Sequence, residues 1–391
     1  MKRSTSRILT THCGSLPRPK DLLDLMKAKA GGQPYDEQAY ASRVKSAVAE
    51  IVRQQTGAGV DIPTDGEQGK LGFFAYVSER LAGFEPRPNA NFPRFTAETE
   101  AFPEYYKQYM SQAMTGGSVS PIIPMVCTGP VSYRGLDAVR RDIENLKAAL
   151  SGVAVEDVFM PSVAPSGVGF NEYYPTEEAY FEAVGEAMRT EYHAIVDAGF
   201  VLQIDDPFLT EIFSRPSMSV AERGKSAELW VEALNHALRG IPTDRVRFHT
   251  CYGINEGPRV HDAPLSDIVE VMLKINAGAY SFEAANARHE HEYHVWESVK
   301  LPDGKLLIPG VVTHASNIVE HPELIAERIG RYARLVGREN VIAGTDCGFS
   351  SQASYNPEIH PTVVWAKFQA MTEGARLATQ QLWGSSAQSA R

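Results

Sequence analysis

The chain has 391 residues, a mass of 43.0 kDa and a formal charge of −10 at neutral pH. This length excludes a small disulfide-stapled scaffold, and an acidic chain with no basic block is a poor match for nucleic acid or an anionic membrane. No apolar run reaches the roughly 18 residues of a membrane-spanning helix, and polar residues follow the first three, so we expect a cytoplasmic protein.

Short apolar runs alternate along the chain with longer segments of helical period. Helices are predicted over 36–56, over 176–198 after Pro175, and over 322–336, where apolar residues recur on one face. The runs that predict strands are 8–11, 60–62, 122–126, 158–163, 200–204, 246–248, 279–282, 306–308 together with 311–312, and 341–343. A strand followed by a helix, repeated this often, indicates a parallel sheet.

This sheet could close into a barrel or remain open. An open doubly wound sheet normally carries a glycine-rich phosphate loop after its first strand, and neither that loop nor a P-loop follows any predicted strand. Polar or small residues follow nearly every strand instead, among them 12–15, 65–67, 205–206, 249–251, 313–314 and 346–347. Such groups at the carboxyl ends of many strands are typical of a (β/α)8 TIM barrel, which is the predicted fold. Nine candidate strands for eight places leave one as an extra strand or as a hairpin outside the barrel.

The segment 84–118 breaks this alternation. It combines four prolines with many aromatic residues and has no clear period. We interpret it as an insertion after the second strand, either a packed surface excursion or a lid over the barrel mouth. The whole of 1–383 is predicted to be one catalytic domain, followed by a flexible Ser/Ala/Gln-rich tail over 384–391.

Two of the four cysteines lie where metal ligands are expected. His249 and Cys251 end one predicted strand, so positions i and i+2 project to the same side and can reach one ion. Glu283 and Cys347 each follow another predicted strand. Because the carboxyl ends of barrel strands share one rim, the four residues together predict one metal site. One imidazole, two thiolates and one carboxylate suit zinc better than magnesium, calcium or iron.

The charge of this site indicates its chemistry. Zinc at +2 with two thiolates and one carboxylate gives a net charge of −1, and such a centre generates hydroxide poorly. It suits a substrate thiol that displaces one ligand, ionises at neutral pH and attacks carbon. The predicted reaction is therefore S-alkylation.

The sequence resembles that of a known protein family. The residues that carry the resemblance are Thr11-His12-Cys13-Gly14-Ser15-Leu16-Pro17-Arg18-Pro19, His249, Cys251, Glu283 and Cys347. Together they are similar to the catalytic barrel of cobalamin-independent methionine synthase, from about residue 8 to about residue 350. The stretches 283–296 and 317–350 are more similar to the short, single-barrel branch, which also includes epoxyalkane:coenzyme M transferase; the N-terminal half of the two-barrel enzymes is absent.

The resemblance implies roles for particular residues. Ser15, Glu67 and Asp205 match positions that hold the amino acid part of homocysteine, and two carboxylates can grip one ammonium. In the folate-using enzymes an Arg-Cys pair and a tryptophan help to bind the pterin, whereas this chain has Ser118-Val119 and the neighbourhood of Asn171 in those places. Methyltetrahydrofolate is therefore not the expected donor.

Further polar residues lie near the predicted rim. His314 could protonate the leaving group and is, with Asp205, a candidate catalytic residue. Asp346 could support the metal site beside Cys347. Arg18, and less directly Arg288, could hold an anionic group of the substrate. Cys13 is expected to be a buried core residue beside Ser15.

We expect a zinc-dependent methyltransferase or alkyltransferase of methionine biosynthesis, with homocysteine as the favoured thiol and small molecules as its partners. The first alternative is the opening of an epoxide by coenzyme M, whose sulfonate would require Arg18 or Arg288. A lyase or decarboxylase related to uroporphyrinogen decarboxylase would require clustered arginines, and a non-catalytic methyl-carrier module would require no open metal position. The sequence leaves open the general acid, the alkyl donor and a homo-oligomeric state.

Overall fold

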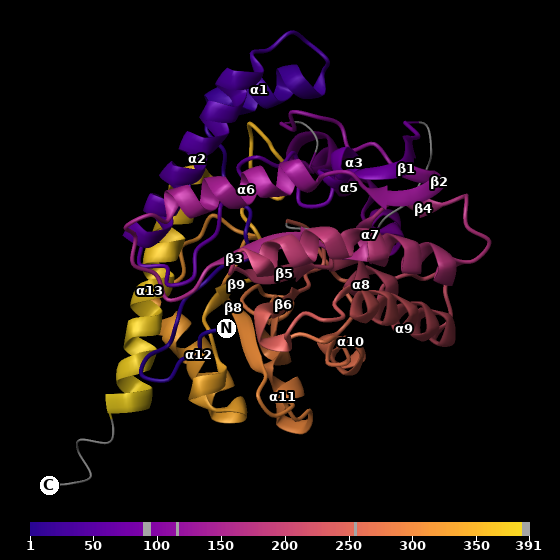
Figure 1. Cartoon of the computed structure of the whole chain (residues 1–391). Helices are drawn as coiled ribbons and strands as arrows, with labels where there is room; N and C mark the ends of the chain where they lie inside the picture. The colour runs from indigo at the N-terminus through magenta and orange to yellow at the C-terminus, as the bar shows by residue number, and fades with distance from the viewer. Residues whose placement is uncertain (89–94, 115–116, 254–255, 385–391) are drawn as a thin grey trace, which may run out of the picture.

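The computed structural model describes residues 1–88, 95–114, 117–253 and 256–384. Its largest sheet has six parallel strands and curls, with helices around its outside (Figure 1). The strands lie in the order β3 (Phe159–Val163), β5 (Val201–Asp205), β6 (Val246–His249), β7 (Ala279–Phe282), β8 (Leu306–Val312) and β9 (Gly344–Thr345). The predicted α/β class and the predicted parallel sheet are confirmed.

Two extended segments, 8–11 and 60–63, lie between β9 and β3. The main-chain hydrogen bonds that place them run from Ala343 N to Leu9 O at 2.9 Å, from Ile62 N to Thr10 O at 3.1 Å and from Phe159 N to Pro63 O at 3.2 Å. These contacts form isolated parallel bridges and not continuous ladders. The closed eight-stranded barrel therefore stays a prediction, although the segments occupy the expected places.

A second, smaller sheet contains the ninth candidate strand. It has the order β1 (Leu81–Pro86), β2 (Met125–Tyr133) and β4 (Phe170–Asn171), and β1 and β2 are antiparallel. The apolar run 122–126 leads into β2 and so belongs to an antiparallel strand pair beside the large sheet, not to the parallel sheet (Figure 1).

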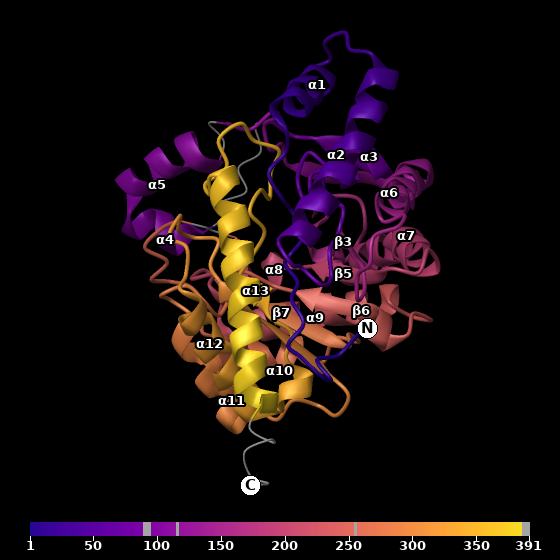
Figure 2. The ribbon, with the colours of Figure 1, turned by 90° about the vertical axis from the view of Figure 1, so that its left-hand side faces the viewer.

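Helices surround the large sheet in every view (Figure 2). They are α1 (Lys20–Ala30), α2 (Glu37–Gly57), α3 (Val77–Arg80), α4 (Thr96–Ala101), α5 (Pro103–Tyr109), α6 (Leu136–Ala149), α7 (Glu177–Asp197), α8 (Pro207–Phe213), α9 (Val220–Ala237), α10 (Leu265–Met272), α11 (Val295–Ser298), α12 (Pro322–Val336) and α13 (Pro361–Trp383). The three predicted helices correspond to α2, α7 and α12. Side-chain caps explain two of their starts, because Asp36 accepts from the main chain of α2 and Thr176 from that of α7.

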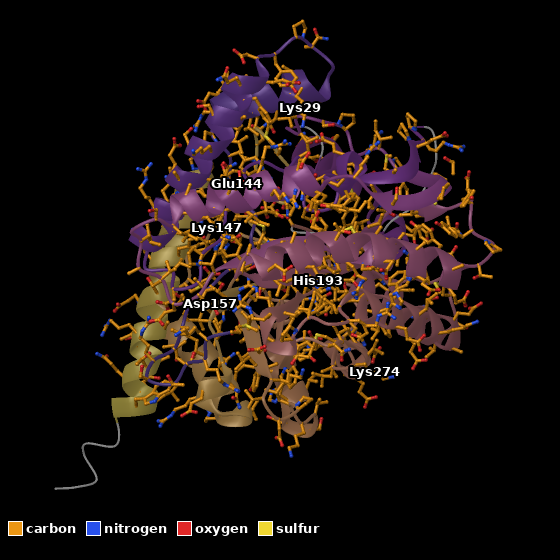
Figure 3. All side chains as sticks on the ribbon, viewed as in Figure 1. Lys29, Glu144, Lys147, Asp157, His193 and Lys274 are labelled. Atoms are coloured by element: carbon orange, nitrogen blue, oxygen red, sulfur yellow. The ribbon has the colours of Figure 1, made fainter. Side chains whose placement is uncertain are left out.

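The long helix α13 packs beside the N-terminal segment, which it joins through a hydrogen bond from Ile8 N to the Thr379 hydroxyl at 3.0 Å (Figure 2). Charged side chains such as Glu144 and Lys147 project outward from α6, and Lys274 projects from the turn that follows α10 (Figure 3). Within the described ranges, no helix is both long and apolar enough to cross a bilayer.

A buried arginine ties the N-terminal loop to the middle of the sheet. Arg247 on β6 is 1% exposed, and its guanidinium carbon lies 3.4 Å from the centre of the Phe159 ring. It donates hydrogen bonds to the Gln203 side chain at 2.7 Å, to the Thr11 hydroxyl at 2.9 Å and to the main-chain oxygen of His12. This network places the loop that begins at residue 12 against the carboxyl ends of β5 and β6.

Candidate metal centre and substrate pocket

Three of the four predicted metal ligands lie together. The ligand atoms of His249, Cys251 and Cys347 all lie within 4.8 Å of one another, and the three side chains are buried. The two sulfur atoms are 3.2 Å apart, and both cysteines are free thiols. Nε2 of His249 has no hydrogen-bond partner in the described part of the chain. An unpartnered buried nitrogen beside two thiols is a donor set that fits a soft or borderline metal ion such as zinc.

The electrostatics of this group suit a neutral imidazole ligand. Burial lowers the pKa of His249 to about 3, so the ring is neutral at physiological pH. The hydrogen bond to Cys251, and then burial, raise the pKa of the Cys347 thiol. A metal ion would therefore have to displace a thiol proton on binding, as expected for thiolate sites.

The orientation of His249 depends on a residue that the sequence did not single out. Nδ1 of His249 lies 3.2 Å from the hydroxyl of Ser281 on the neighbouring strand β7, and 3.5 Å from Sγ of Cys13. Donation from Nδ1 to Ser281 leaves Nε2 as the metal-binding nitrogen. Ser281 and His249 are paired in the sheet. Side chains alternate along a strand, so Ser281, two residues before Glu283, projects to the same side as Glu283; this spacing could have identified Ser281 from the sequence.

Ser281→Ala should weaken zinc binding by about 10-fold or more, because the imidazole loses the partner that fixes its orientation. Competition with a chromophoric chelator measures this affinity. Ser298→Ala, at the end of α11, removes an exposed serine hydroxyl and is the matched control. Unchanged zinc affinity in Ser281→Ala would show that the hydroxyl does not orient the ligand.

The structure does not bring Glu283, the fourth predicted ligand, into this group. Its carboxylate accepts from Tyr252 N at 3.0 Å, from Arg259 Nη2 at 2.8 Å and from Asn286 Nδ2 at 2.8 Å. It lies instead in a second buried group with His314 and Asp346, whose ligand atoms are within 4.8 Å of one another. Coordination of a metal by Glu283 therefore stays a prediction.

His314 and Asp346 have different surroundings within this second group. Asp346 accepts from the main chain of Ala284 at 2.7 Å and of Ala285 at 2.8 Å, so it shapes the loop that follows Glu283. Nδ1 of His314 has no hydrogen-bond partner among the described residues, and burial lowers the pKa of this ring to about 3. Its part in catalysis stays a prediction.

The predicted amine pocket contains two buried carboxylates. Glu67 is 1% exposed and has a φ of 55°, a conformation that non-glycine residues rarely adopt outside functional sites. Burial, and then the nearby Glu67 charge, raise the pKa of Asp205 well above its usual value. Two carboxylates that repel each other in a buried place are well suited to bind a cation.

Ser15 lies next to the metal-ligand loop. A Cβ at Gly348, the residue after Cys347, would lie 2.0 Å from the Ser15 hydroxyl, so a larger residue there would force that hydroxyl to move. The main-chain oxygen of Ser15 also accepts from Phe349 N at 2.9 Å. The predicted substrate-binding serine and the predicted ligand Cys347 are therefore held in neighbouring loops.

A buried lysine in this pocket was not predicted. Nζ of Lys70 lies 3.3 Å from the Glu67 carboxylate, donates to the main-chain oxygen of Pro161 at 2.7 Å and lies 4.3 Å from the centre of the Tyr76 ring. Burial alone would lower the pKa of Lys70, but Glu67 and Asp65 raise it. Lys70 lies three residues after Glu67 in the sequence, and this spacing could have indicated that the two side chains pair.

Arg18 holds the main chain of this pocket. One nitrogen donates to the main-chain oxygens of Glu67 and Lys70 at 2.9 and 2.8 Å, and another donates to the main-chain oxygen of Ser350 at 3.0 Å. It therefore supports the strained turn at Glu67, and a contact with substrate stays a prediction. Arg288 is exposed and donates to the main-chain oxygen of Val260 at 3.4 Å.

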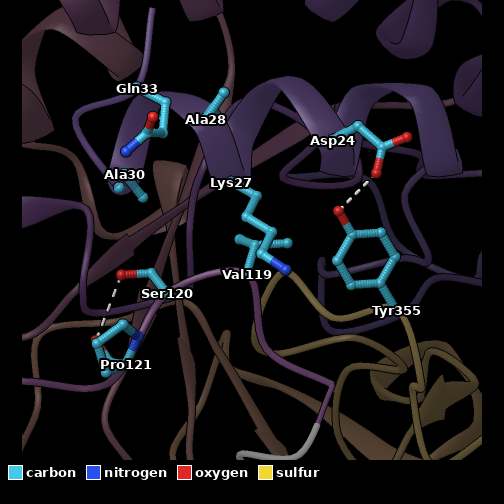
Figure 4. A pocket seen from close by; sticks show the side chains of 10 residues that line it. Asp24, Lys27, Ala28, Ala30, Gln33, Val119, Ser120, Pro121 and Tyr355 are labelled. Carbon is cyan, nitrogen blue, oxygen red and sulfur yellow. Dashed lines mark hydrogen bonds between the residues drawn. The ribbon is translucent and has the colours of Figure 1, made fainter.

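A surface cavity lies apart from these groups. It is a surface groove of about 480 Å³ between α1, residues 119–121 and Tyr355, whose hydroxyl donates to Asp24 at 2.7 Å (Figure 4). None of its lining residues is a predicted ligand or pocket residue. The groove therefore gives no independent support to the site.

The chain matches a protein-family model and is similar in sequence to known enzymes. Residues 169–363 match the family model described as the catalytic domain of cobalamin-independent synthase. The chain is similar to methionine synthases of Sulfolobus acidocaldarius, at 24% identity over 87% of this chain and 85% of the relative, and of Thermococcus kodakarensis, at 23% identity over 95% and 94%.

Two solved structures share the fold. A B12-independent methionine synthase from Shewanella sp. W3-18-1 in complex with selenomethionine matches with a TM-score of 0.72 at 16% identity, over 97% of this chain and 99% of that one. A putative vitamin-B12 independent methionine synthase from Listeria monocytogenes matches with a TM-score of 0.66 at 18% identity, over 95% and 98%. At these identities the likeness concerns the fold.

Proposed function

Because this chain belongs to the cobalamin-independent methionine synthase family, we propose that it is a zinc-dependent enzyme that transfers a methyl or alkyl group to a small thiol. The observation that carries this proposal is the buried group of His249, Cys251 and Cys347, with its unpartnered imidazole nitrogen. Zinc bound there would lower the pKa of a substrate thiol and keep it nucleophilic. The segments 8–11 and 60–63 would complete the eight-stranded barrel around it.

The residues of this chain bind and orient the substrate in the proposed reaction. Glu67 and Asp205 hold the ammonium of homocysteine, and the turn at Ser15 offers donors to its carboxylate. Glu283 would be the fourth ligand of a metal ion held by His249, Cys251 and Cys347, and Asp346 would support it by shaping the loop from Ala284. His314 holds a proton near the leaving group.

Thiol binding tests this function. Homocysteine added to zinc-loaded protein at pH 7 should bind and release about one proton, because the thiol binds as a thiolate. Isothermal titration in buffers of different ionisation enthalpy measures that proton. Tighter binding of coenzyme M than of homocysteine would favour the epoxide-opening alternative, and binding of neither thiol would contradict the proposal.

Asp205→Asn should weaken homocysteine binding by about 1–3 kcal/mol, because a charge-assisted contact with the ammonium is lost. Zinc content should not change. Titration of the zinc-loaded variant measures the effect, and 4-mercaptobutanoate, which is homocysteine without the ammonium, is the matched control ligand. Equal weakening for both thiols would place Asp205 outside the amine pocket.

A further inference from the structure

A buried arginine holds the carboxylate that the proposed metal site needs. Arg259 is 2% exposed, and its Nη2 lies 2.8 Å from the Glu283 carboxylate. In the described part of the chain it is the only arginine or lysine paired with Glu283. No oxygen of Glu283 lies within 4.8 Å of all three ligand atoms of His249, Cys251 and Cys347. The carboxylate is therefore bound by a cation while the other three ligands are together.

The backbone conformation of Arg259 is unusual, and helix α4 supports it through hydrogen bonds. Its φ is 53°, in the left-handed region. Its main-chain N–H donates to Glu98 of helix α4 at 3.1 Å, and the N–H of His261 donates to the same carboxylate at 2.6 Å. Glu98 is 3% exposed and also accepts from the Tyr106 hydroxyl at 2.7 Å. Thus Glu98 of helix α4 supports the loop that presents Arg259 to Glu283.

Asp262, the other carboxylate that pairs with Arg259, also contacts His289. Nε of Arg259 donates to Asp262 at 2.7 Å, and Nε2 of His289 lies 3.1 Å from the same carboxylate. Burial alone would lower the pKa of His289, but its hydrogen bonds to Asp262 and Glu292 raise it to about 9, so it is a cation at neutral pH. Among the described residues, Arg259 is the one cationic side chain paired with Glu283, so we expect this carboxylate to be the more sensitive of the two to loss of Arg259.

We propose that Arg259 is a positioning residue that receives the Glu283 carboxylate when a substrate thiol takes its place on the metal. This inference rests on the proposed function and assigns a residue to its ligand exchange. In that exchange the thiol S–H bond breaks and its proton goes to solvent. The sulfur would replace the carboxylate of Glu283 as a metal ligand, and Arg259 would hold that carboxylate through the pairing that the structure contains.

If Arg259 has this role, its removal changes the affinity for the metal and the affinity for the thiol in opposite directions. A partner that stabilises Glu283 away from the metal weakens metal binding by the thiol-free protein, because the two compete for one carboxylate. The same partner strengthens thiol binding, because it stabilises the product of the exchange. Loss of a merely structural clamp would instead weaken both equilibria.

Arg259→Gln should therefore bind zinc about 10-fold more tightly and homocysteine about 10-fold more weakly than the parent, within the range of effects seen for residues that support metal ligands. Chelator competition measures the first affinity, and calorimetric titration of zinc-loaded protein measures the second. Glu283→Gln should remove both effects of Arg259→Gln. Arg331→Gln, which removes one of two arginines paired with Glu290 on the outside of the barrel, is the matched control.

Glu98→Gln provides a second route if Arg259→Gln does not fold. It weakens the support of the Arg259 loop and changes no charge that touches Glu283, so it should move both affinities in the same directions by a smaller factor. Glu100→Gln, on the same helix and exposed, is its control. Parallel changes in the two affinities would overturn the inference and leave the proposed function in place, whereas a parent that binds neither zinc nor thiol would overturn both.

Discussion

Replacing Cys251 or Cys347 by alanine should leave the purified protein with little zinc, where the parent should carry about one ion per chain. The two sulfur atoms are 3.2 Å apart and both are buried beside the unpartnered nitrogen of His249. Removing either thiol leaves two close ligands, too few to hold zinc against a chelator. Elemental analysis after dialysis measures the metal content.

The matched control is Cys127→Ala. Cys127 is also fully buried, but it lies on β2 and its thiol donates to the main-chain oxygen of Gly129 at 3.2 Å. This variant should keep its zinc. Full zinc retention in both Cys251→Ala and Cys347→Ala would contradict the assignment of the site.

Thermal stability should change less than metal content in these variants. The site lies at the carboxyl ends of strands whose apolar side chains form a core without the metal. A catalytic metal site differs in this respect from a zinc finger, which is unfolded without its metal. Far-UV circular dichroism of the metal-depleted variants should therefore remain that of a folded α/β protein.

The three predicted ligands that the structure brings together, His249, Cys251 and Cys347, share a local signal in the sequence. His249 and Cys251 are two residues apart at the end of a buried strand, and Cys347 follows another apolar strand. Since parallel strands have their carboxyl ends at one edge, such residues meet whatever the details of the loops. The helix α12 was predictable for a similar reason, because its apolar face and Pro322 lie within one short segment.

The supporting residues could not be predicted in this way. Glu98 and Arg259 are 161 positions apart, and their contact depends on where helix α4 packs relative to the loop at Arg259. Arg18 was predicted near the substrate because it follows Ser15 closely, yet its side chain reaches back to main-chain oxygens at Glu67 and Lys70. Sequence proximity identifies the loop on which a residue lies but not the direction of a long side chain.

The segment 84–118 was predicted to be either a surface excursion or a lid. The structure describes α4 and α5 within it, while residues 89–94 and 115–116 lie outside the described ranges, as does most of the predicted tail, 385–391. The contact of Glu98 with Arg259 places α4 beside the loop whose arginine pairs with Glu283. Its movement as a lid stays a prediction.

Polyglutamylated methyltetrahydrofolate should be a poor methyl donor for this protein, or none. A pterin is flat and polar, and an aromatic platform with a fixed cation supplies much of its affinity and orientation. Asn171, near the expected tryptophan position, donates to Tyr174 O at 3.0 Å and to Glu177 at 3.2 Å. Ser118, at the position of the Arg-Cys pair, donates to Ser120 O at 2.7 Å. Neither position offers a ring or a cation.

The zinc-bound thiolate should nevertheless react, because its nucleophilicity depends on the metal site and not on the donor pocket. Zinc-loaded protein and homocysteine are therefore incubated separately with methyltetrahydrofolate, methylcobalamin, an epoxide and a methyl thioether, and the alkylated thiol is quantified by mass spectrometry. Cys251→Ala gives the background reaction of the free thiol with each donor. Turnover above this background with methylcobalamin or a small electrophile, and none with the folate, is the expected result; efficient folate-dependent formation of methionine would show that a pterin binds without the platform and the cation.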